Sequence, residues 1–279
     1  MTSAMLLLAS CGDADTDDAA TNSDSSSGWS AADAGRSDGA PTITEPTGDA
    51  PDSLEVTDIA EGDGTEVTNG SVAVVDYVGA SFSNGTVFDA SYGRSPFPVT
   101  VGAGRVIKGW DEGLVGMKVG GKRQLVIPAD LGYGDTGSPP DIAPGETLIF
   151  IIELRAVVSR PENPEPTGDV TELTTETLVE GSGDAVVESG SQATVHYIGV
   201  HATTGEPFDA SWDRGEPFTV AVGSGSVIAG WDQGLVGMKL GERRLLTIPS
   251  DLAYGPEGRP PLIAADEDLV FVVDLVGIA

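Results

Sequence analysis

Two stretches of this sequence carry the same aromatic and carboxylate residues. Phe88-Asp89 recurs as Phe208-Asp209, and the tryptophan-containing stretch 109–118 recurs at 230–239. The chain has a single cysteine and two histidines, which excludes an internal disulfide, a cysteine-based zinc cluster and a dithiol redox pair. The repeated residues instead suit chemistry without a nucleophile, in which apolar rings and a few hydroxyl groups position a substrate.

Two weaker signals would point to other chemistry. His196 and His201 could bind a metal, but they lie across a strand and a turn without cysteine partners, so we expect no metal and no cofactor. Stretches 102–104 and 223–225 are rich in glycine, yet they lack the Lys-Ser/Thr of a phosphate loop and precede no long helix. We expect them to be turns that lead into a short helix.

The charge and composition exclude several classes of partner. Asp and Glu total 44 against 14 Lys and Arg, which gives a formal net charge of −30. Nucleic acid and anionic lipid both require a basic surface, so neither is expected to be bound through the protein surface. With 38 Gly and 18 Pro, the chain favours short strands and turns. No apolar run approaches the roughly 18 residues of a transmembrane helix.

Most of the chain is an internal duplication. Residues 46–49 recur at 166–169, an offset of 120, whereas 109–118 recur at an offset of 121 because the second copy has one extra residue between Arg214 and Phe218. Two copies with this period indicate two globular domains. Pro161, Pro164 and Pro166 lie between the copies and predict an extended, fairly stiff spacer.

The elements that must position the repeated residues are mostly strands. In the first copy, β-branched and apolar runs predict strands over 71–78, 97–101, 122–127 and 147–157, with a hairpin turn at 84–85. Trp110, Leu114 and Met117 follow helical spacing and predict one short helix over 108–117. Its glycines make this helix weak alone, so it must pack on the sheet. The predicted fold class is α+β, with a curved antiparallel sheet wrapped over one short helix in each domain.

The motif Val-Ile-x-Gly-Trp-x-x-Gly-Leu-x-Gly-Met, present in both copies, resembles the FKBP-type peptidyl-prolyl cis–trans isomerases, the macrolide-binding immunophilins. Supporting motifs of the first copy are Phe88-Asp89, Pro96-Phe97, Ile127-Pro128 and Leu131-Gly132-Tyr133-Gly134. Those of the second copy are Val195-His196-Tyr197, Phe208-Asp209, Pro217-Phe218, Ile248-Pro249 and Leu252-Ala253-Tyr254-Gly255. The resemblance covers nearly all of each copy. It implies two FKBP-like domains that act on proline-containing polypeptide clients and bind macrolide inhibitors.

The resemblance also implies an aromatic cup, with tryptophan as its floor, that accepts a proline ring. In the first copy the catalytic positions are Tyr77, Phe88, Asp89 and Tyr133, and the substrate-binding positions are Arg94, Phe97, Val106, Ile107, Trp110, Ile142 and Phe150. In the second copy they are Tyr197, Phe208, Asp209 and Tyr254, with Arg214, Phe218, Val227, Ile228, Trp231, Ile263 and Phe271. Taken singly, the tryptophans could be ordinary core residues and the tyrosines ordinary strand residues.

Two details of the cup follow from these positions. Asp89 and Asp209 are expected to pair with Arg94 and Arg214 across a turn and to orient the tyrosines. The family often has His and Ile in the loop after the second tyrosine, where the first copy has Ser138 and Asp141 and the second has Arg259 and Leu262. Because Asp141 replaces an apolar wall, we expect the second domain to be the more complete site.

The N-terminal residues 1–11 end in Leu-Ala-Ser-Cys and resemble a bacterial lipoprotein signal, a family in which the cysteine, here Cys11, is acylated. The segment lacks a basic region and its apolar stretch is short, so the true start could lie elsewhere. The alternative is a cytoplasmic protein with a free thiol. Residues 12–52 are acidic, with Trp29 and Ile43 as the only large apolar residues, and predict a disordered tether.

These expectations combine into one organisation: a signal segment 1–11, a tether 12–52, a domain 53–158, a proline-rich linker 159–170 and a second domain 171–279. The expected function is isomerisation of X–Pro bonds during extracytoplasmic protein folding, by a chain anchored at the outer face of a bacterial membrane. The alternatives are a secreted or cytoplasmic location, and a non-catalytic polypeptide-binding chaperone or scaffold that retains the fold.

Overall fold

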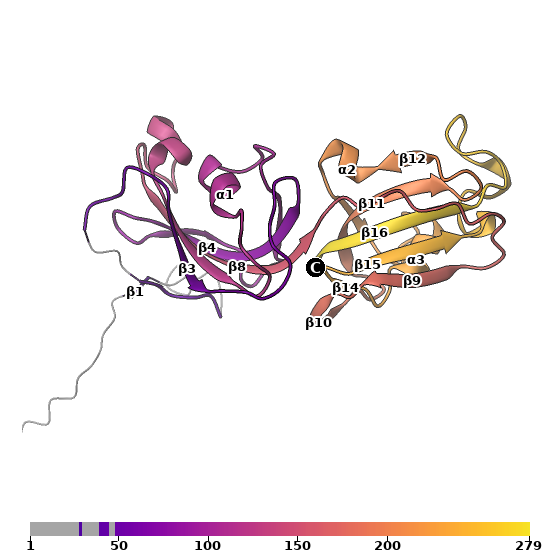
Figure 1. Ribbon diagram of the computed structural model, residues 1–279, viewed down its shortest axis with the longest axis horizontal. Coiled ribbons are helices and arrows are strands. Elements are labelled where there is room, and N and C mark those ends of the chain that lie inside the picture. The colour runs from indigo at the N-terminus through magenta and orange to yellow at the C-terminus, as the bar shows by residue number, and fades with distance from the viewer. Residues whose placement is uncertain (1–27, 30–38, 45–47) are drawn as a thin grey trace, which may run out of the picture.

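The computed structural model describes residues 28–29, 39–44 and 48–279, which form two domains that lie side by side (Figure 1). Each domain is built on one antiparallel sheet that carries short helices, so the α+β prediction is confirmed. Cys11 and most of the predicted tether lie outside the described residues. In the described part of the chain, no helix has the length and apolar character needed to cross a membrane.

The sheet of domain 1 has its longest strands at its centre. Its order is β3 (Glu55–Ala60), β7 (Lys122–Ile127), β8 (Leu148–Val158), β4 (Val72–Ser81) and β5 (Val87–Ala90), and β6 (Phe97–Thr100) also pairs with β4. The predicted strands are present within a few residues of their expected ends. The turn predicted at 84–85 joins β4 to β5, with the N–H of Gly85 bonded to the carbonyl of Ser81.

Domain 2 repeats this order. Its sheet runs β9 (Thr174–Val179), β15 (Arg243–Ile248), β16 (Leu269–Ile278), β11 (Gln192–His201) and β12 (Pro207–Ala210), and β13 (Phe218–Ala221) also pairs with β11. The smaller pairs are β10 (Ser182–Val186) with β14 (Lys239–Leu240), and β1 (Gly28–Trp29) with β2 (Ile43–Thr44). Short 3-10 helices follow β7 and β15: η1 (Ala129–Leu131), η2 (Gly134–Thr136), η3 (Ser250–Leu252) and η4 (Gly255–Glu257).

One short helix packs on the concave face of each sheet, α1 (Lys108–Gly113) in domain 1 and α3 (Ala229–Gly234) in domain 2. Helix α1 ends before the predicted end at Met117, because Gly116 takes a φ of +80° that no helix contains. The prediction that Trp110, Leu114 and Met117 face the core is confirmed, since all three side chains are buried. A Cβ at Gly113 would lie 2.7 Å from Leu125, so glycine lets the helix approach the sheet closely.

Domain 2 has an additional single-turn helix, α2 (Ser211–Arg214), where domain 1 has a turn. It begins directly after β12 and ends at Gly215, which adopts the left-handed conformation with φ +66°. The expectation of one helix in each domain is therefore incomplete for the second domain. The extra turn lies next to the residue inserted in this copy.

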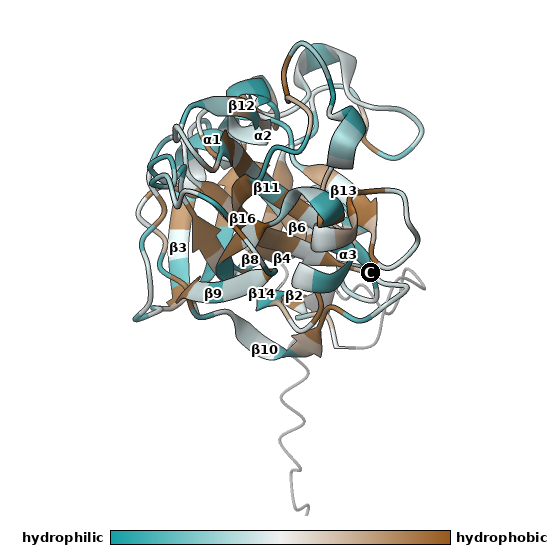
Figure 2. Cartoon of the chain, turned by 90° about the vertical axis from the view of Figure 1, so that its right-hand side faces the viewer, coloured by the Kyte–Doolittle hydropathy of each residue, from teal (hydrophilic) through white to brown (hydrophobic). Residues whose placement is uncertain are grey.

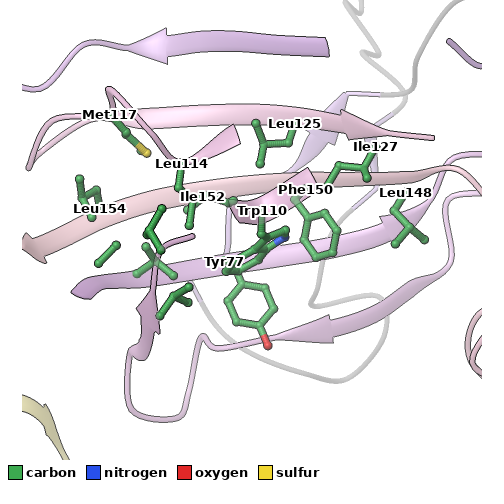
Figure 3. Close-up of a cluster of buried hydrophobic side chains, with 14 of the residues drawn as sticks. Tyr77, Trp110, Leu114, Met117, Leu125, Ile127, Leu148, Phe150, Ile152 and Leu154 are labelled. Atoms are coloured by element: carbon green, nitrogen blue, oxygen red, sulfur yellow. The ribbon is translucent and has the colours of Figure 1, made fainter. Parts of the chain in front are cut away.

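The core of each domain lies between the sheet and its helix. Figure 2 shows the brown apolar strands enclosed by paler and teal loops, and Figure 3 shows the cluster of domain 1, in which Leu114 and Trp110 of the helical segment face the strands. A second apolar layer covers the opposite face. There, Ile43 of β2 is fully buried in a cluster with Val78 and Ile149, so the structure differs at this segment from the expected disordered tether.

The proline-rich segment does not separate the two domains. Val72, Val74, Ala156 and Val158 at one end of the domain 1 sheet are buried in a common cluster with residues of domain 2. The domain 2 residues are Val276, Trp212 and Leu240. The end of the segment also binds domain 2, where the N–H groups of Thr167 and Gly168 donate to the carbonyl of Ala202. The two domains therefore contact each other directly.

Candidate active sites

An aromatic cup opens on the concave side of each sheet. In domain 1 the indole of Trp110 meets the rings of Tyr77 and Phe150 edge to face, at centroid distances of 5.1 and 5.3 Å (Figure 3). Phe97 lies 6.3 Å from the same indole, and Phe88 lies 5.6 Å from Phe150. This edge-to-face order is favourable between aromatic rings and keeps them around a hollow rather than stacked across it.

The hollow of domain 1 is a cavity of about 630 Å³. It is lined by Tyr77, Phe88, Asp89, Phe97, Gly104, Arg105, Val106, Ile107, Lys108, Trp110, Gly132, Tyr133 and Phe150. Nine of the eleven residues predicted for this site line it. The two exceptions are Arg94, which lies outside it and is largely exposed, and Ile142, which is buried in the core.

Domain 2 has a larger cavity of about 800 Å³ at the equivalent place. It is lined by Tyr197, Phe208, Asp209, Phe218, Ser226, Val227, Ile228, Ala229, Trp231, Ala253, Tyr254, Arg259, Leu262, Ile263 and Phe271. Of the predicted residues only Arg214 does not line it. The loop after Tyr254 contributes Arg259, Leu262 and Ile263, whereas no residue of the loop 134–146 lines the cavity of domain 1.

A tyrosine, an aspartate and an arginine form a network at the edge of each cavity. In domain 1 the hydroxyl of Tyr77 donates to Asp89 Oδ2, and Arg94 Nη2 donates to Asp89 Oδ1 at 2.7 Å. The same arginine nitrogen also donates to the carbonyl of Ala90. Burial, followed by the hydrogen bond to Asp89, raises the pKa of Tyr77 well above its usual value, so the hydroxyl stays protonated.

The network of domain 2 has the same three members. Tyr197 donates to Asp209 at 2.5 Å, and Arg214 donates both to Asp209, through Nη1 at 2.5 Å, and to the Tyr197 hydroxyl, through Nη2 at 2.9 Å. Burial and the bond to Asp209 raise the pKa of Tyr197 to about 12. The expected pairing of both aspartates with their arginines is thus present, and each aspartate orients its tyrosine.

Two aspartates that the sequence reasoning did not single out hold the rim next to the helix. Asp111 accepts hydrogen bonds from the N–H groups of Gly102 and Gly104 at 2.8 and 2.9 Å, and Asp232 does the same for Gly223 and Gly225. The glycine stretches are therefore turns before a helix, as predicted. The signal was the Gly-Trp-Asp sequence common to both copies.

Donors for a substrate carbonyl remain available beside these turns. Ile107 and Ile228 come directly before α1 and α3, and within the described residues their N–H groups have no hydrogen-bond partner. The hydroxyls of Tyr133 and Tyr254 also make no hydrogen bond to another described residue. By contrast, the hydroxyl proton of Tyr197 is committed to Asp209.

The two histidines contact different residues and do not form a common site. His196 is buried, stacks on Trp212 at a centroid distance of 4.3 Å and lies 3.1 Å from Ser211 Oγ. His201 pairs instead with Glu267 at 2.8 Å. Among the residues that the structure describes, no group of three potential ligands could hold a metal ion.

Comparison with known proteins gives a consistent family. A family model described as FKBP-type peptidyl-prolyl cis-trans isomerase matches residues 64–155 and 183–276. An FK506-binding protein of Streptomyces anulatus is 52% identical over 119 residues, covering 42% of this chain and 96% of that protein. The human peptidyl-prolyl cis-trans isomerase FKBP10 is 39% identical over 214 residues, covering 76% of this chain and 35% of that protein.

A solved structure of the three FKBP domains of wheat FKBP73 is 25% identical, with a TM-score of 0.40, and the match covers 81% of this chain and 94% of that chain. This chain spans about a third of the length of human FKBP10.

Each domain is a curved antiparallel sheet packed on one short helix, with an aromatic cup whose floor is a tryptophan of that helix. This arrangement defines an FKBP-like domain, and the molecule contains two of them. Since the family model matches more than half of the chain, the chain belongs to the FKBP-type peptidyl-prolyl cis-trans isomerases.

Proposed function

We propose that this chain accelerates cis–trans isomerisation of X–Pro bonds in polypeptides that fold outside the cytoplasm, with domain 2 as the principal site. The observation that carries the proposal is the cavity of domain 2, in which Tyr197, Trp231 and Phe271 place aromatic rings around a space of about 800 Å³. An apolar hollow with few polar groups at its edge suits a proline ring with its flanking peptide.

The barrier to this reaction arises from amide resonance. Rotation passes through a twisted amide roughly 18–20 kcal/mol above the planar form, and the unaided reaction takes tens of seconds or more. The twisted amide has lost resonance and has a less polar carbonyl. A water-poor aromatic pocket therefore favours it over the planar, well-solvated amide.

The polar groups would position the substrate within this pocket. Because the proton of Tyr197 is held by Asp209, the donors proposed for the substrate carbonyls are the N–H of Ile228 and the hydroxyl of Tyr254. The network of Tyr197, Asp209 and Arg214 would fix one wall of the pocket while the amide rotates. In this mechanism no side chain gains or loses a proton.

The test is the isomerisation of a proline tetrapeptide by the full chain. We expect the double variant Phe88→Ala with Phe208→Ala to lose at least about 10-fold in kcat/KM, since each change removes a ring that shields the amide. Ile59→Ala, at a half-exposed position of β3 outside both cavities, is the matched control. Circular dichroism checks that each variant folds.

Two results would contradict this proposal. If the wild-type chain shows no turnover but still binds unfolded polypeptide, the non-catalytic chaperone or scaffold is correct. If turnover is unchanged in the folded double variant, the site assignment is wrong. The name of the Streptomyces relative also supports a proposal that FK506-type macrolides occupy the same cavities, which predicts that such a macrolide inhibits turnover.

The proposed location rests on the sequence of residues 1–11. We propose that Cys11 is acylated and anchors the chain to the outer face of a bacterial membrane, with the acidic segment as a spacer. Labelled fatty acid should be incorporated into the wild-type chain and not into Cys11→Ala. Recovery of the wild-type protein with an unmodified Met1 would overturn the anchor while leaving the isomerase proposal intact.

A further inference from the structure

The two domains meet at the loop that carries the arginine of the second active site. Arg105 of domain 1 forms an ion pair with Glu216, with Nη1 2.7 Å from Oε1, and its Nη2 donates to the backbone carbonyl of Arg214 at 3.1 Å. The segment from Ser211 to Glu216 also contacts the linker, through the pair of Asp213 with Arg160 at 3.0 Å. The loop is therefore held from outside its own domain.

This contact departs from the internal repeat at both of its ends. Glu216 lies where the second copy has its extra residue, since Gly215-Glu216 stands in the place of Ser95. Arg105 corresponds to Ser226 in the second copy. Neither partner is thus required by the domain fold itself, and the pair exists only because these two non-equivalent copies are joined in this order.

The same segment contains Arg214, which belongs to the network of Tyr197, Asp209 and Arg214. The guanidinium of Arg214 bonds both Asp209 and the hydroxyl of Tyr197, whereas its backbone carbonyl is the group that Arg105 binds. Gly215 follows with a φ of +66°, and a Cβ there would lie 3.3 Å from Arg105 Nη2. The position of Arg214 is therefore set from one side by Asp209 and from the other by Arg105.

We propose that Arg105 of domain 1 is a positioning residue for the active site of domain 2: by holding Glu216 and the carbonyl of Arg214, it keeps Arg214 in place on Asp209 and Tyr197. The first domain thereby raises the activity of the second, an asymmetry with no counterpart in the opposite direction at Ser226. This inference rests on the proposed isomerase function of domain 2.

The size of the effect follows from the exposure of the pair. The side chain of Arg105 is 44% exposed and that of Glu216 is 68% exposed, so solvent and salt screen their attraction. Pairs of this kind contribute modestly, and we expect losses of about 2- to 5-fold in the turnover of domain 2. The effect should fade near about 1 M salt, where the screening length is only about 3 Å.

The experiment measures domain 2 within the full chain, in a Phe88→Ala background that silences domain 1. The variants are Arg105→Glu, Glu216→Arg and the double exchange of both. Each single variant should lower kcat by about 2- to 5-fold at low salt, since two like charges then face each other. The exchange should recover only the part of the loss that comes from the ion pair, because a glutamate at position 105 cannot donate to the carbonyl of Arg214. Lys118→Glu, at an exposed position of domain 1 outside both cavities, is the matched control for the change of charge.

Three outcomes would overturn the proposal: single variants as active as the background, single losses that the exchange does not recover even in part, or a loss in Glu216→Arg that persists at high salt. The side-chain NMR signal of Arg214 gives a second readout, which should shift in the single variants and return in the exchange. If domain 2 is inactive in the background, the proposed function fails, whereas this signal still decides whether Arg105 positions Arg214.

Discussion

The two domains share a sheet, a helix and an aromatic floor, yet the edges of their pockets differ. In domain 2, Arg214 closes a three-membered network with Asp209 and Tyr197. In domain 1 one nitrogen of Arg94 binds both Asp89 and the carbonyl of Ala90, and the same side chain also interacts with the Tyr77 hydroxyl. The sheet and core of a duplicated domain can thus stay constant while the residues at the rim of its site change.

The walls of the two pockets differ in the same way. The loop after Tyr254 adds Leu262 to the cavity, although 55% of that side chain is exposed. In domain 1 the equivalent Asp141 is exposed and does not line the cavity, so it does not place a carboxylate in the wall as the sequence suggested. On the opposite rim, Arg105 and Lys108 of domain 1 are basic where domain 2 has a serine and an alanine.

The largest expected effect is a difference in kcat/KM between variants of the aspartate in each network. Asp209→Val should lower kcat/KM of the full chain by about 10- to 100-fold, because an unpaired Tyr197 hydroxyl and Arg214 cost about 1–3 kcal/mol. The matched Asp89→Val variant should leave most of the activity, since domain 2 is the principal site. Tetrapeptide turnover and the unfolding midpoint of both variants provide the check. Equal losses from the two substitutions would mean that the sites are equivalent.

The next largest effect is a dependence of stability on pH that is expected in domain 2 through His196. Burial and the charge of Arg214 lower the pKa of His196 to about 4, and domain 1 has Asp76 at this position. Because the pKa in the folded chain lies below the ordinary 6.5, the unfolded chain takes up the proton first, and stability is lost as pH falls from 6.5 towards 4. At pH 5 this loss is about 2 kcal/mol for domain 2.

The measurement is the free energy of unfolding of the full chain and of His196→Asn between pH 7 and about pH 4.5, a range that spans most of the shift. Asp274, opposite His196 on β16, acts in the other direction, since burial raises its pKa to about 6 and its protonation favours the folded state. The difference between wild type and variant therefore isolates His196. A difference that does not change with pH would contradict the prediction.

The smallest expected effect concerns the loop that follows the second tyrosine of each site. Leu262→Asp should raise KM of domain 2 by about 3- to 10-fold, because a partly exposed leucine contributes only a fraction of the roughly 0.8 kcal/mol per buried methylene. Asp141→Leu in domain 1 should change KM little, since that side chain does not line the cavity. Peptide titrations with one domain silenced measure both. A gain in affinity from Asp141→Leu would restore the wall role that the sequence suggested for this position.

Much of the fold could be predicted because it depends on local patterns of residue types. The β-branched apolar run of β4 and the spacing of Trp110, Leu114 and Met117 indicate a strand and a buried helical stripe without knowledge of distant contacts. The extent of the helix could not be predicted in this way. It ends at Gly113 because the backbone of Gly116 turns, and a helical pattern of side chains continues past the last helical residue.

The candidate sites were also largely predicted, since a motif repeated twice in the same order restricts where each aromatic ring must lie. One kind of residue was missed, and one predicted residue does not line its cavity. Asp111 and Asp232 act by binding backbone N–H groups, and their signal was the Gly-Trp-Asp sequence common to both copies, which does not by itself show what the carboxylate binds. Ile142 was assigned to the site, and it is buried in the cluster that also holds Tyr77 and Trp110 without lining the cavity.

Local patterns in the amino-acid sequence specify the duplication, the fold of each copy and the aromatic residues of both cups, because these depend on short-range periodicity and on motifs that each copy carries complete. The burial of Ile43 against the first sheet and the contact of Arg105 with Glu216, 111 residues further along the chain, emerge only in the folded protein. Those contacts depend on how separate surfaces dock, and no local pattern of residue types encodes the distance between them.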